Sequence, residues 1–237
     1  MIIDLLKKSL KNISQLFYGI IIVKNRMFKF FSFFGKSNET IFSNFYNKNK
    51  WGDNESFSGC GSTVEATIET RKIVKKIIED YKIKSFLDIP CGDFNWMKLI
   101  DFKECKYYGS DIVKKIIENN KKYESKNIKF FKSNITKDRI EKYDLIFCRD
   151  CLVHLSNKDI SKALKNIKKS NSRFLLTTIF PFNKKNQWIA SGMWRPLNLM
   201  KKPFLLPKPT ALYIESEDKF SRKERYKYLA LWEIKKI

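Results

Sequence analysis

The sequence has no apolar run long enough to cross a membrane. The longest such run, Leu16–Val23, falls far short of the roughly 20 residues that a spanning helix needs. The charged N-terminus lacks a long apolar core followed by a small-residue cleavage site, which argues against a signal peptide. We therefore expect a cytoplasmic protein.

Cysteine and histidine are also scarce. Five cysteines, an odd number without regular spacing, do not suggest a disulfide framework and favour a reducing compartment. Cys148 and Cys151 have CxxC spacing, but a zinc site needs about four ligands, and the single histidine, His154, would have to contribute. The favoured interpretation is structural, with Cys148 ending a buried strand and Cys151 beginning the next loop or helix. We expect no bound metal.

Acidic residues are few beside the basic ones. The 237 residues include 48 Lys and Arg against 25 Asp and Glu, for a net charge of +23. Such a charge fits a polyanionic partner, an anionic membrane surface or a phosphorylated substrate. The lysines are scattered instead of gathered in one arm, so charge alone does not favour nucleic-acid binding. A hydrophobic content of 43% excludes a disordered chain and is enough for one α/β domain.

The N-terminal region has a helical hydrophobic pattern. Within residues 1–36, apolar side chains recur at spacings of three and four, as in Leu6, Leu10, Ile13, Phe17 and Ile20. This predicts one or two basic amphipathic helices, which either lie at a membrane surface or pack as a cap on the domain or on a second subunit. The cap is favoured. We assign residues 1–50 to this helical extension and 51–237 to the main domain.

From Lys84 onward, strand patterns alternate with helical ones. The predicted strands are Lys84–Ile89, Tyr107–Asp111, Ile128–Ser133, Tyr143–Cys148, Arg173–Ile179, Thr210–Ser216 and Tyr226–Ile234. Helices through Lys122 and over Ser161–Lys169 separate earlier strands and predict a parallel sheet, because parallel neighbours cannot be joined by a tight turn. The last two strands have no helix between them and are predicted to form an edge hairpin. The long segment 180–209 is predicted to be a substrate lid.

Two acidic residues end the first two predicted strands. Asp88 lies in a turn where Gly92 allows close backbone approach to a ligand, and Asp111 follows about 20 residues later. In open α/β sheets, ligands bind outside the carboxyl ends of the strands, and an acid at this spacing holds a ribose diol. Without a G-x-G-x-x-G motif to cradle a pyrophosphate, the pattern indicates a nucleoside instead of a dinucleotide.

These residues resemble the class I S-adenosylmethionine-dependent methyltransferases. The successive blocks of that family correspond here to FLDIPCGDFNWM, YYGSDI, FFKSNIT and YDLIFCRDCLVHL. The phrases SGCGST, LLTTIF and GMWRPLNL further resemble a bacterial subfamily often linked to capsule or other surface-polysaccharide genes. The resemblance implies S-adenosylmethionine as cofactor. It also implies a Rossmann-like α/β fold, with a seven-stranded, mostly parallel sheet, helices on both faces and a C-terminal antiparallel hairpin.

The resemblance assigns the cofactor site residue by residue. The Asp88–Asp93 turn should face the methionyl part, Asp111 should hold the ribose hydroxyls, and Asn134 and Ile135 should border the adenine. The turn Ser58–Ser62 is a further candidate, either as an anion-binding turn or as a hinge with Ser62 or Thr63 as the next helix N-cap. The cofactor candidates are Asp88, Pro90, Cys91, Gly92, Asp93, Trp96, Asp111, Ile112, Asn134, Ile135, Arg149, Gly59 and Gly61.

The sequence departs from the family pattern at three positions. Pro90 and Phe94 stand where many relatives have glycine, so the turn has a less permissive backbone. Asn134 stands where an aspartate often binds the adenine amino group, a bond that an amide oxygen can still accept. Trp51 either closes over the cofactor or anchors the core.

Two residues after the fourth predicted strand are candidates for proton transfer. A hydroxyl acceptor must lose its proton, and His154, with an ordinary pKa near 6.5, suits that task. The alternative is a histidine that packs the start of the next helix. Asp150 is the second candidate base, with a capping or loop-bonding role as its alternative. The resemblance places Arg149 and Asp150 between cofactor and acceptor.

The predicted lid supplies three candidates for substrate binding. Tryptophan stacks on sugar faces, arginine binds carboxylate or phosphate through a bidentate fork, and asparagine both donates and accepts. These residues are Trp194, Arg195 and Asn198. For Trp194, structural packing is the alternative interpretation.

Together these features predict an O-methyltransferase acting on a small-molecule or glycan-precursor substrate. The favoured acceptor is a surface-polysaccharide precursor, either a sugar hydroxyl or a phosphorylated intermediate. An RNA or protein methyltransferase recruited by the positive charge is the alternative, although Cys148-Arg-Asp-Cys151 differs from the Asn/Asp-Pro-Pro-aromatic turn of base methyltransferases. A noncatalytic binding protein at the membrane is a third hypothesis, against which the acids at both strand ends argue.

Overall fold

The computed structural model describes residue 33 and residues 35–216 and 226–237. The amphipathic helices expected near the N-terminus lie outside these residues, so they remain predictions. The chain divides into two compact units, residues 1–36 and 37–237, and the following description concerns the second. No helix in the described ranges is long and apolar enough to span a bilayer.

The second unit begins earlier than the expected boundary at Trp51. Helix α2 (Asn38–Asn47) belongs to it, with Ser37 as the N-cap whose Oγ accepts a hydrogen bond from the backbone N–H of Thr40. Tyr46 is buried in a cluster with Val113 and Ile116. The boundary moves to Ser37 because the apolar face of α2 is buried within this unit.

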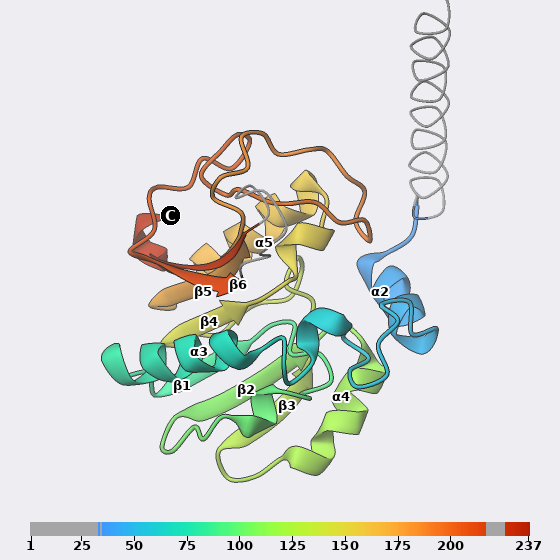
Figure 1. Cartoon of the computed structure of the whole chain (residues 1–237), viewed down its shortest axis with the longest axis vertical. Coiled ribbons are helices and arrows are strands. Elements are labelled where there is room, and N and C mark those ends of the chain that lie inside the picture. Colours follow the sequence, from blue (N-terminus) through green and yellow to red (C-terminus); the bar gives the residue numbers. More distant parts are fainter. Residues whose placement is uncertain (1–32, 34, 217–225) are drawn as a thin grey trace, which may run out of the picture. The chain divides into compact units, whose positions relative to one another are not determined.

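A seven-stranded sheet forms the centre of the unit, with strand order β3-β2-β1-β4-β5-β7-β6 (Figure 1). The strands are β1 (Ser85–Asp88), β2 (Lys106–Asp111), β3 (Ile128–Lys132), β4 (Leu145–Cys148), β5 (Phe174–Ile179), β6 (Ala211–Ser216) and β7 (Lys227–Glu233). The first five pair in parallel, whereas β7 pairs antiparallel with both β5 and β6. The predicted sheet and its C-terminal hairpin are confirmed.

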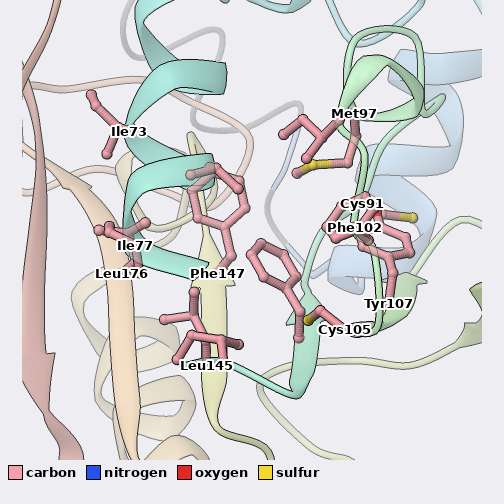
Figure 2. Close-up of a cluster of buried hydrophobic side chains, with 14 of the residues drawn as sticks. Ile73, Ile77, Cys91, Met97, Phe102, Cys105, Tyr107, Leu145, Phe147 and Leu176 are labelled. Atoms are coloured by element: carbon pink, nitrogen blue, oxygen red, sulfur yellow. The ribbon is translucent and has the colours of Figure 1, made fainter. Parts of the chain in front are cut away.

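Helices cover both faces of the sheet because the strand residues alternate in direction. On one face, α3 (Ile68–Asp80) packs its Ile73 and Ile77 in one cluster with Phe147 and Leu176 (Figure 2). The opposite face has a second cluster that includes α5 (Asn157–Lys169). Each central strand thus contributes to two cores, as a period-two pattern with both faces buried requires.

The remaining helices are short. Helix α4 (Lys114–Asn120) follows β2 and continues as the 3₁₀ turn Lys121–Tyr123. The 3₁₀ turn Leu152–His154 follows β4 and leads into α5, whose N-cap Ser156 accepts a hydrogen bond from the backbone N–H of Asp159. This cap starts α5 four residues before the predicted Ser161, since the sequence pattern showed the apolar face and not the capping bond.

Residues 180–209 contain no helix or strand, and part of this segment is packed into the domain. Ile189, Leu197 and Leu199 are buried, the last two in the core cluster beside α5. The Asn198 Nδ2 donates to the carbonyl oxygens of Pro181 (2.8 Å) and Asn183 (3.1 Å). The stretch 189–199 is therefore largely buried, whereas many residues on either side of it are exposed, and the role of 180–209 as a substrate lid remains a proposal.

We expect Gly109→Ala to destabilise the fold by about 1–3 kcal/mol, as overpacking of a core does. A Cβ at Gly109 would lie 2.5 Å from ring atoms of the buried Phe130, which packs against Phe94. Thermal unfolding measures the loss. Gly61→Ala is the matched control, because a Cβ there meets only an ordinary contact at 3.7 Å. Equal melting temperatures for the two variants would contradict the prediction.

Candidate cofactor and acceptor site

A cavity of about 370 Å³ opens at the carboxyl ends of β1, β2 and β4. This volume lies within the roughly 300–1,000 Å³ of small-molecule sites. The expected residues that line it are Asp88, Pro90, Cys91, Gly92, Asp93, Trp96, Asp111, Ile112, Asn134, Ile135, Arg149, Gly59, Gly61, Asp150, His154 and Trp194. The fold thus gathers residues from six separate segments around one space.

Asp88 and Asp111 end adjacent parallel strands and line the same cavity. The Tyr107 hydroxyl donates a hydrogen bond of 2.7 Å to Asp88 Oδ2. The backbone N–H of Val113 donates to Asp111 Oδ1 (2.9 Å), and that of Gly92 donates to Asp111 Oδ2 (3.2 Å). Each carboxyl group is therefore held in place by the fold before any ligand arrives.

Burial makes ionisation of both acids costly. Desolvation raises the pKa of Asp88 to about 8, although the Tyr107 hydrogen bond and the charge of Arg149 oppose the shift. Desolvation also raises the pKa of Asp111 to about 6, against the backbone N–H groups that bond to it. Buried acids with raised pKa values in a cavity are typical of functional sites.

Asp93, which lines the cavity, also holds a neighbouring loop in place. Its carboxylate accepts hydrogen bonds from the Ser56 hydroxyl (2.9 Å), the Phe57 backbone N–H (2.8 Å) and the Ser58 hydroxyl (3.1 Å). At Gly92, where φ is +57°, a Cβ would lie 2.4 Å from the Ser58 Oγ. Asp93 therefore fastens residues 56–58 to the turn, and its role toward the cofactor remains a prediction.

The turn Ser58–Ser62 does not lead directly into a long helix. It forms the 3₁₀ turn Cys60–Ser62, and α3 begins only at Ile68 with Thr67 at its N-cap position. The anion-binding helix start expected there is absent, whereas the Thr63 Oγ1 accepts a capping-type hydrogen bond (3.1 Å) from the backbone N–H of Ala66, in the turn that precedes α3. Its contribution is a carbonyl, because the Gly61 oxygen accepts a 2.7 Å hydrogen bond from Arg149 Nη2.

Phe94 and Asn134 show how the departures from the family pattern are accommodated. Phe94 has a φ of +59°, in the left-handed region that favours glycine, and its ring is buried against those of Tyr107 and Phe130. The Asn134 Oδ1 already accepts hydrogen bonds from the backbone N–H (2.9 Å) and the hydroxyl (2.7 Å) of Thr136. Asn134 lines the cavity, but both lone pairs of its amide oxygen are used.

A buried ion-pair network forms one wall of the site. Arg149 Nε donates to Glu215 Oε1, and its Nη1 lies 3.3 Å from Asp150 Oδ2. The Lys227 ammonium lies 2.8 Å from Asp150 Oδ2 and 3.2 Å from Glu215 Oε1. The Thr70 hydroxyl donates to the same Glu215 oxygen. Two cations and two carboxylates are thus joined across β4, β6 and β7.

The sequence analysis missed Glu215, Lys227 and the α2 residues Asn38 and Phe42, all of which contribute to this region. Lys227, Asn38 and Phe42 line the cavity. An acid within the apolar segment Ala211–Ser216 was a usable signal for Glu215. Lys227 had no such signal, because lysine is abundant along the whole chain.

Asp150 is a weak proton acceptor in this setting. Burial acts to raise the pKa of its carboxyl, but the charges of Lys227 and Arg149 outweigh burial and hold the pKa well below its ordinary range. Its residue also has a φ of +49°, with its backbone N–H donating to the Thr178 hydroxyl. The loop-bonding role, given above as the alternative for Asp150, fits these contacts better than the role of a base.

His154 keeps its proton on Nδ1 and its ring in the neutral form. Nδ1 lies 3.2 Å from the Met193 carbonyl oxygen, which can only accept, so this nitrogen must donate. Burial lowers the pKa of His154 below its ordinary value, although Asp150 opposes that shift. Nε2 therefore carries a lone pair, and the ring lines the cavity beside Trp51.

Only one of the three expected substrate residues reaches the cavity. Trp194 lines it and remains 55% exposed, with its ring edge-on to Phe180 at 5.8 Å. Arg195 is 1% exposed and bonds to the Leu155 carbonyl, and Asn198 is fully buried. The Nη1 and Nη2 of Arg195 and the Nδ2 of Asn198 donate to groups inside residues 153–200, and neither side chain lines the cavity.

The two cysteines of the CxxC pair occupy the positions expected of structural residues. Cys148 is the last residue of β4 and is buried, and Cys151 precedes the 3₁₀ turn Leu152–His154. Both thiols are free. Cys151 also lines the cavity.

Comparison with known proteins agrees with this geometry. Residues 87–171 match the family model described as a methyltransferase domain. The N-methyltransferase NodS from Bradyrhizobium japonicum, solved with S-adenosyl-L-homocysteine, is 13% identical, with a TM-score of 0.57 over 80% of this chain and 98% of that one. Magnesium protoporphyrin IX methyltransferase from Synechocystis PCC 6803, with bound S-adenosylmethionine, is 16% identical, with a TM-score of 0.54 over 84% and 97%.

The chain has the class I methyltransferase fold. The methyltransferase domain of a bacterial Hen1 protein is also similar, with 14% identity and a TM-score of 0.51 over 70% of this chain and 96% of that one. No curated protein sequence is significantly similar to this chain. The expected cofactor agrees with the ligands present in the first two neighbours, S-adenosyl-L-homocysteine and S-adenosylmethionine.

We expect Asp88→Asn to stabilise the ligand-free methyltransferase fold at pH 8. The folded-state pKa of Asp88 is about 8, whereas the unfolded-state value is near 3.9, so folding takes up a proton between these values. Stability from this group is therefore lost as pH rises through that window. The asparagine variant escapes the loss, and its Oδ1 can still accept from Tyr107.

Melting temperatures between pH 5 and pH 9 provide the measurement. The wild-type melting temperature should fall more steeply with pH than that of Asp88→Asn. Glu65→Gln, at an exposed position, is the matched control and should follow the wild type. Parallel curves for the wild type and Asp88→Asn would contradict the assignment of a raised pKa.

Proposed function

We propose that this protein transfers a methyl group from S-adenosylmethionine to a hydroxyl acceptor that enters beside Trp194, with His154 as general base. The observation that carries the proposal is the neutral His154 ring on the wall of the cavity that Asp88 and Asp111 also line. One cavity thus offers a place for a nucleoside cofactor and a proton acceptor for the second substrate.

The residues of the cavity fit the cofactor. Each carboxylate oxygen of Asp111 accepts one hydrogen bond from a backbone N–H. Each oxygen can therefore accept a further hydrogen bond from a ribose hydroxyl. The raised pKa of Asp88 means that a cationic group placed nearby would favour its charged form. The bound cofactor would supply an electrophilic methyl group on a sulfonium. The apolar and aromatic lining, which includes Trp96 and Phe147, would exclude water.

His154 performs the proton step in this proposal. A hydroxyl oxygen that attacks the methyl group becomes more acidic as its new bond forms, and Nε2 accepts the proton. The Met193 carbonyl stabilises the resulting imidazolium through the proton on Nδ1. Asp150, already paired with Lys227, contributes negative charge without taking a proton.

The acceptor class follows from the groups left available at the wall. Both cations that line the cavity within the described ranges, Arg149 and Lys227, are paired with carboxylates. A reacting phosphate would therefore find no unpaired cation there, which favours a neutral hydroxyl. The exposed ring of Trp194 suits the flat face of a sugar.

We therefore favour a sugar hydroxyl over a phosphorylated group as the site of methylation. The link to surface-polysaccharide precursors rests on the sequence phrases from Ser58 onward, including that around Trp194. The structural neighbours named above act on different acceptors according to their names, so the fold alone does not select one.

RNA is the acceptor class that competes with a sugar, because of the net charge of +23. Incubation with labelled S-adenosylmethionine and fractionated cell extract would locate the transferred label. Label in a glycan precursor would support the proposal, whereas label in RNA, with an affinity that falls steeply with salt, would support the competitor. Absence of transfer to any fraction would count against an enzyme.

Asp111→Ala should weaken S-adenosylmethionine binding at least tenfold, by removing the acceptor for the ribose hydroxyls. Titration calorimetry measures the dissociation constant. The wild type must bind S-adenosylmethionine for this comparison to hold. A noncatalytic relic of the fold would not bind it. Glu65→Gln again serves as the control and should bind like the wild type.

His154→Ala should lower turnover at least tenfold while the cofactor dissociation constant stays unchanged. The expected loss reflects removal of a general base, which contributes about 10²–10⁴-fold in enzymes. Steady-state kinetics and calorimetry on the same preparations separate the two effects. Near-normal turnover would eliminate His154 as the base and leave the cofactor assignment intact.

A further inference from the structure

The segment Gly192–Arg195 runs alongside the 3₁₀ turn that carries His154. The Gly192 backbone N–H donates to the His154 carbonyl (2.8 Å), and the Arg195 backbone N–H donates to the Val153 carbonyl (3.2 Å). Between these bonds, the Met193 carbonyl accepts from His154 Nδ1. One short segment thus bonds to both the backbone carbonyl and the imidazole ring of His154.

The Arg195 side chain completes this attachment at an energetic cost. Its Nη1 donates to the Leu155 carbonyl (2.7 Å), and its Nη2 donates to Asn157 Oδ1 (3.0 Å). Nε is buried without a partner, and no carboxylate in the described part of the chain forms an ion pair with the guanidinium. Burial accordingly lowers the pKa of Arg195 to about 10.

A buried cation without a counter-ion is an expensive way to fill space. An apolar side chain of similar length would pack there without the desolvation cost. The position of Arg195, directly behind the turn Leu152–His154, suggests what the charge does. Its guanidinium bonds to Leu155 and Asn157, which directly follow this turn, and its charge acts on the imidazole.

We propose that Arg195 is a positioning residue for His154: its fork fixes the residues that directly follow the turn carrying the imidazole, and its charge adds to burial in disfavouring protonation of the ring. This inference rests on the proposed role of His154 as the base. It replaces the expectation that Arg195 binds substrate.

The charged groups around His154 determine the direction of the effect. Burial lowers the pKa of His154, and Arg195 and Lys227 lower it further. Asp150, at the end of β4, opposes them. Removing the charge of Arg195 leaves Asp150 less opposed, so the pKa of His154 should rise. A larger fraction of the rings would then be protonated at neutral pH and unable to accept a proton.

The test uses the fact that His154 is the only histidine in the chain. In untagged protein, the imidazole carbon-bound protons give a single set of NMR signals, whose titration reports the pKa of His154 directly. Two variants separate charge from geometry. Arg195→Met removes both the charge and the fork, whereas Arg195→Lys keeps a charge and loses the planar fork.

We expect Arg195→Met to raise the pKa of His154 by about half a unit and to move the acidic limb of the kcat profile upward by the same amount. Turnover at neutral pH should fall about tenfold, with cofactor affinity unchanged. Arg195→Lys should titrate close to the wild type and recover part of the turnover. Circular dichroism of both variants verifies that they fold.

Two results would overturn the inference. An unchanged His154 titration in folded Arg195→Met would remove the electrostatic role, whatever happens to turnover. A loss of turnover that is equal in both variants, without a shifted pH profile, would mean a purely structural arginine. Failure of the proposed base is distinguishable, because it would appear as normal turnover in His154→Ala while the NMR titration still responds to Arg195.

Discussion

Desolvation of two carboxyl groups at the ends of adjacent parallel strands is the constraint around which this site is built. The register that pairs Asp88 with Gly109 brings Asp88 and Asp111 to one cavity. Burial disfavours the charged form of both acids, and hydrogen bonds from a tyrosine hydroxyl and from backbone N–H groups offset part of this desolvation cost. A site that carries this cost is suited to a ligand that supplies positive charge and hydroxyl donors.

The ion-pair network separates the chemistry of the cavity from the charge of the whole protein. Arg149 and Lys227 are neutralised locally by Asp150 and Glu215, so a chain with a net charge of +23 presents a wall with no unpaired cation among its described residues. Surface charges are screened within about 10 Å at ordinary salt. The scattered lysines therefore affect how a charged partner approaches the protein more than they affect the reacting atoms in the cavity. The net charge of the chain therefore does not indicate which acceptor the cavity binds.

Residues 180–209 support the site more than they cover it. Trp194 faces the cavity, while its neighbours Met193 and Arg195 hold His154 and the turn behind it. Asn198 fixes the same segment through backbone carbonyls. In the proposed function, a base whose proton is placed in this way needs no rearrangement at the moment of reaction, which is the advantage of preorganisation.

The sequence by itself determined the alternation of strands and helices, the terminal hairpin and the acids Asp88 and Asp111, because periodicity and strand-end chemistry are local properties. It could not assign a role to Arg195 and Asn198. The guanidinium and amide donors of these side chains can bond equally well to a ligand or to a buried carbonyl oxygen. Only the tertiary structure decided that they bond inward, that α2 joins the domain, and that Glu215 pairs with both Arg149 and Lys227. The Arg149–Glu215 and Asp150–Lys227 pairings span 66 and 77 residues of sequence, and no local pattern encodes which partner a buried charge will find.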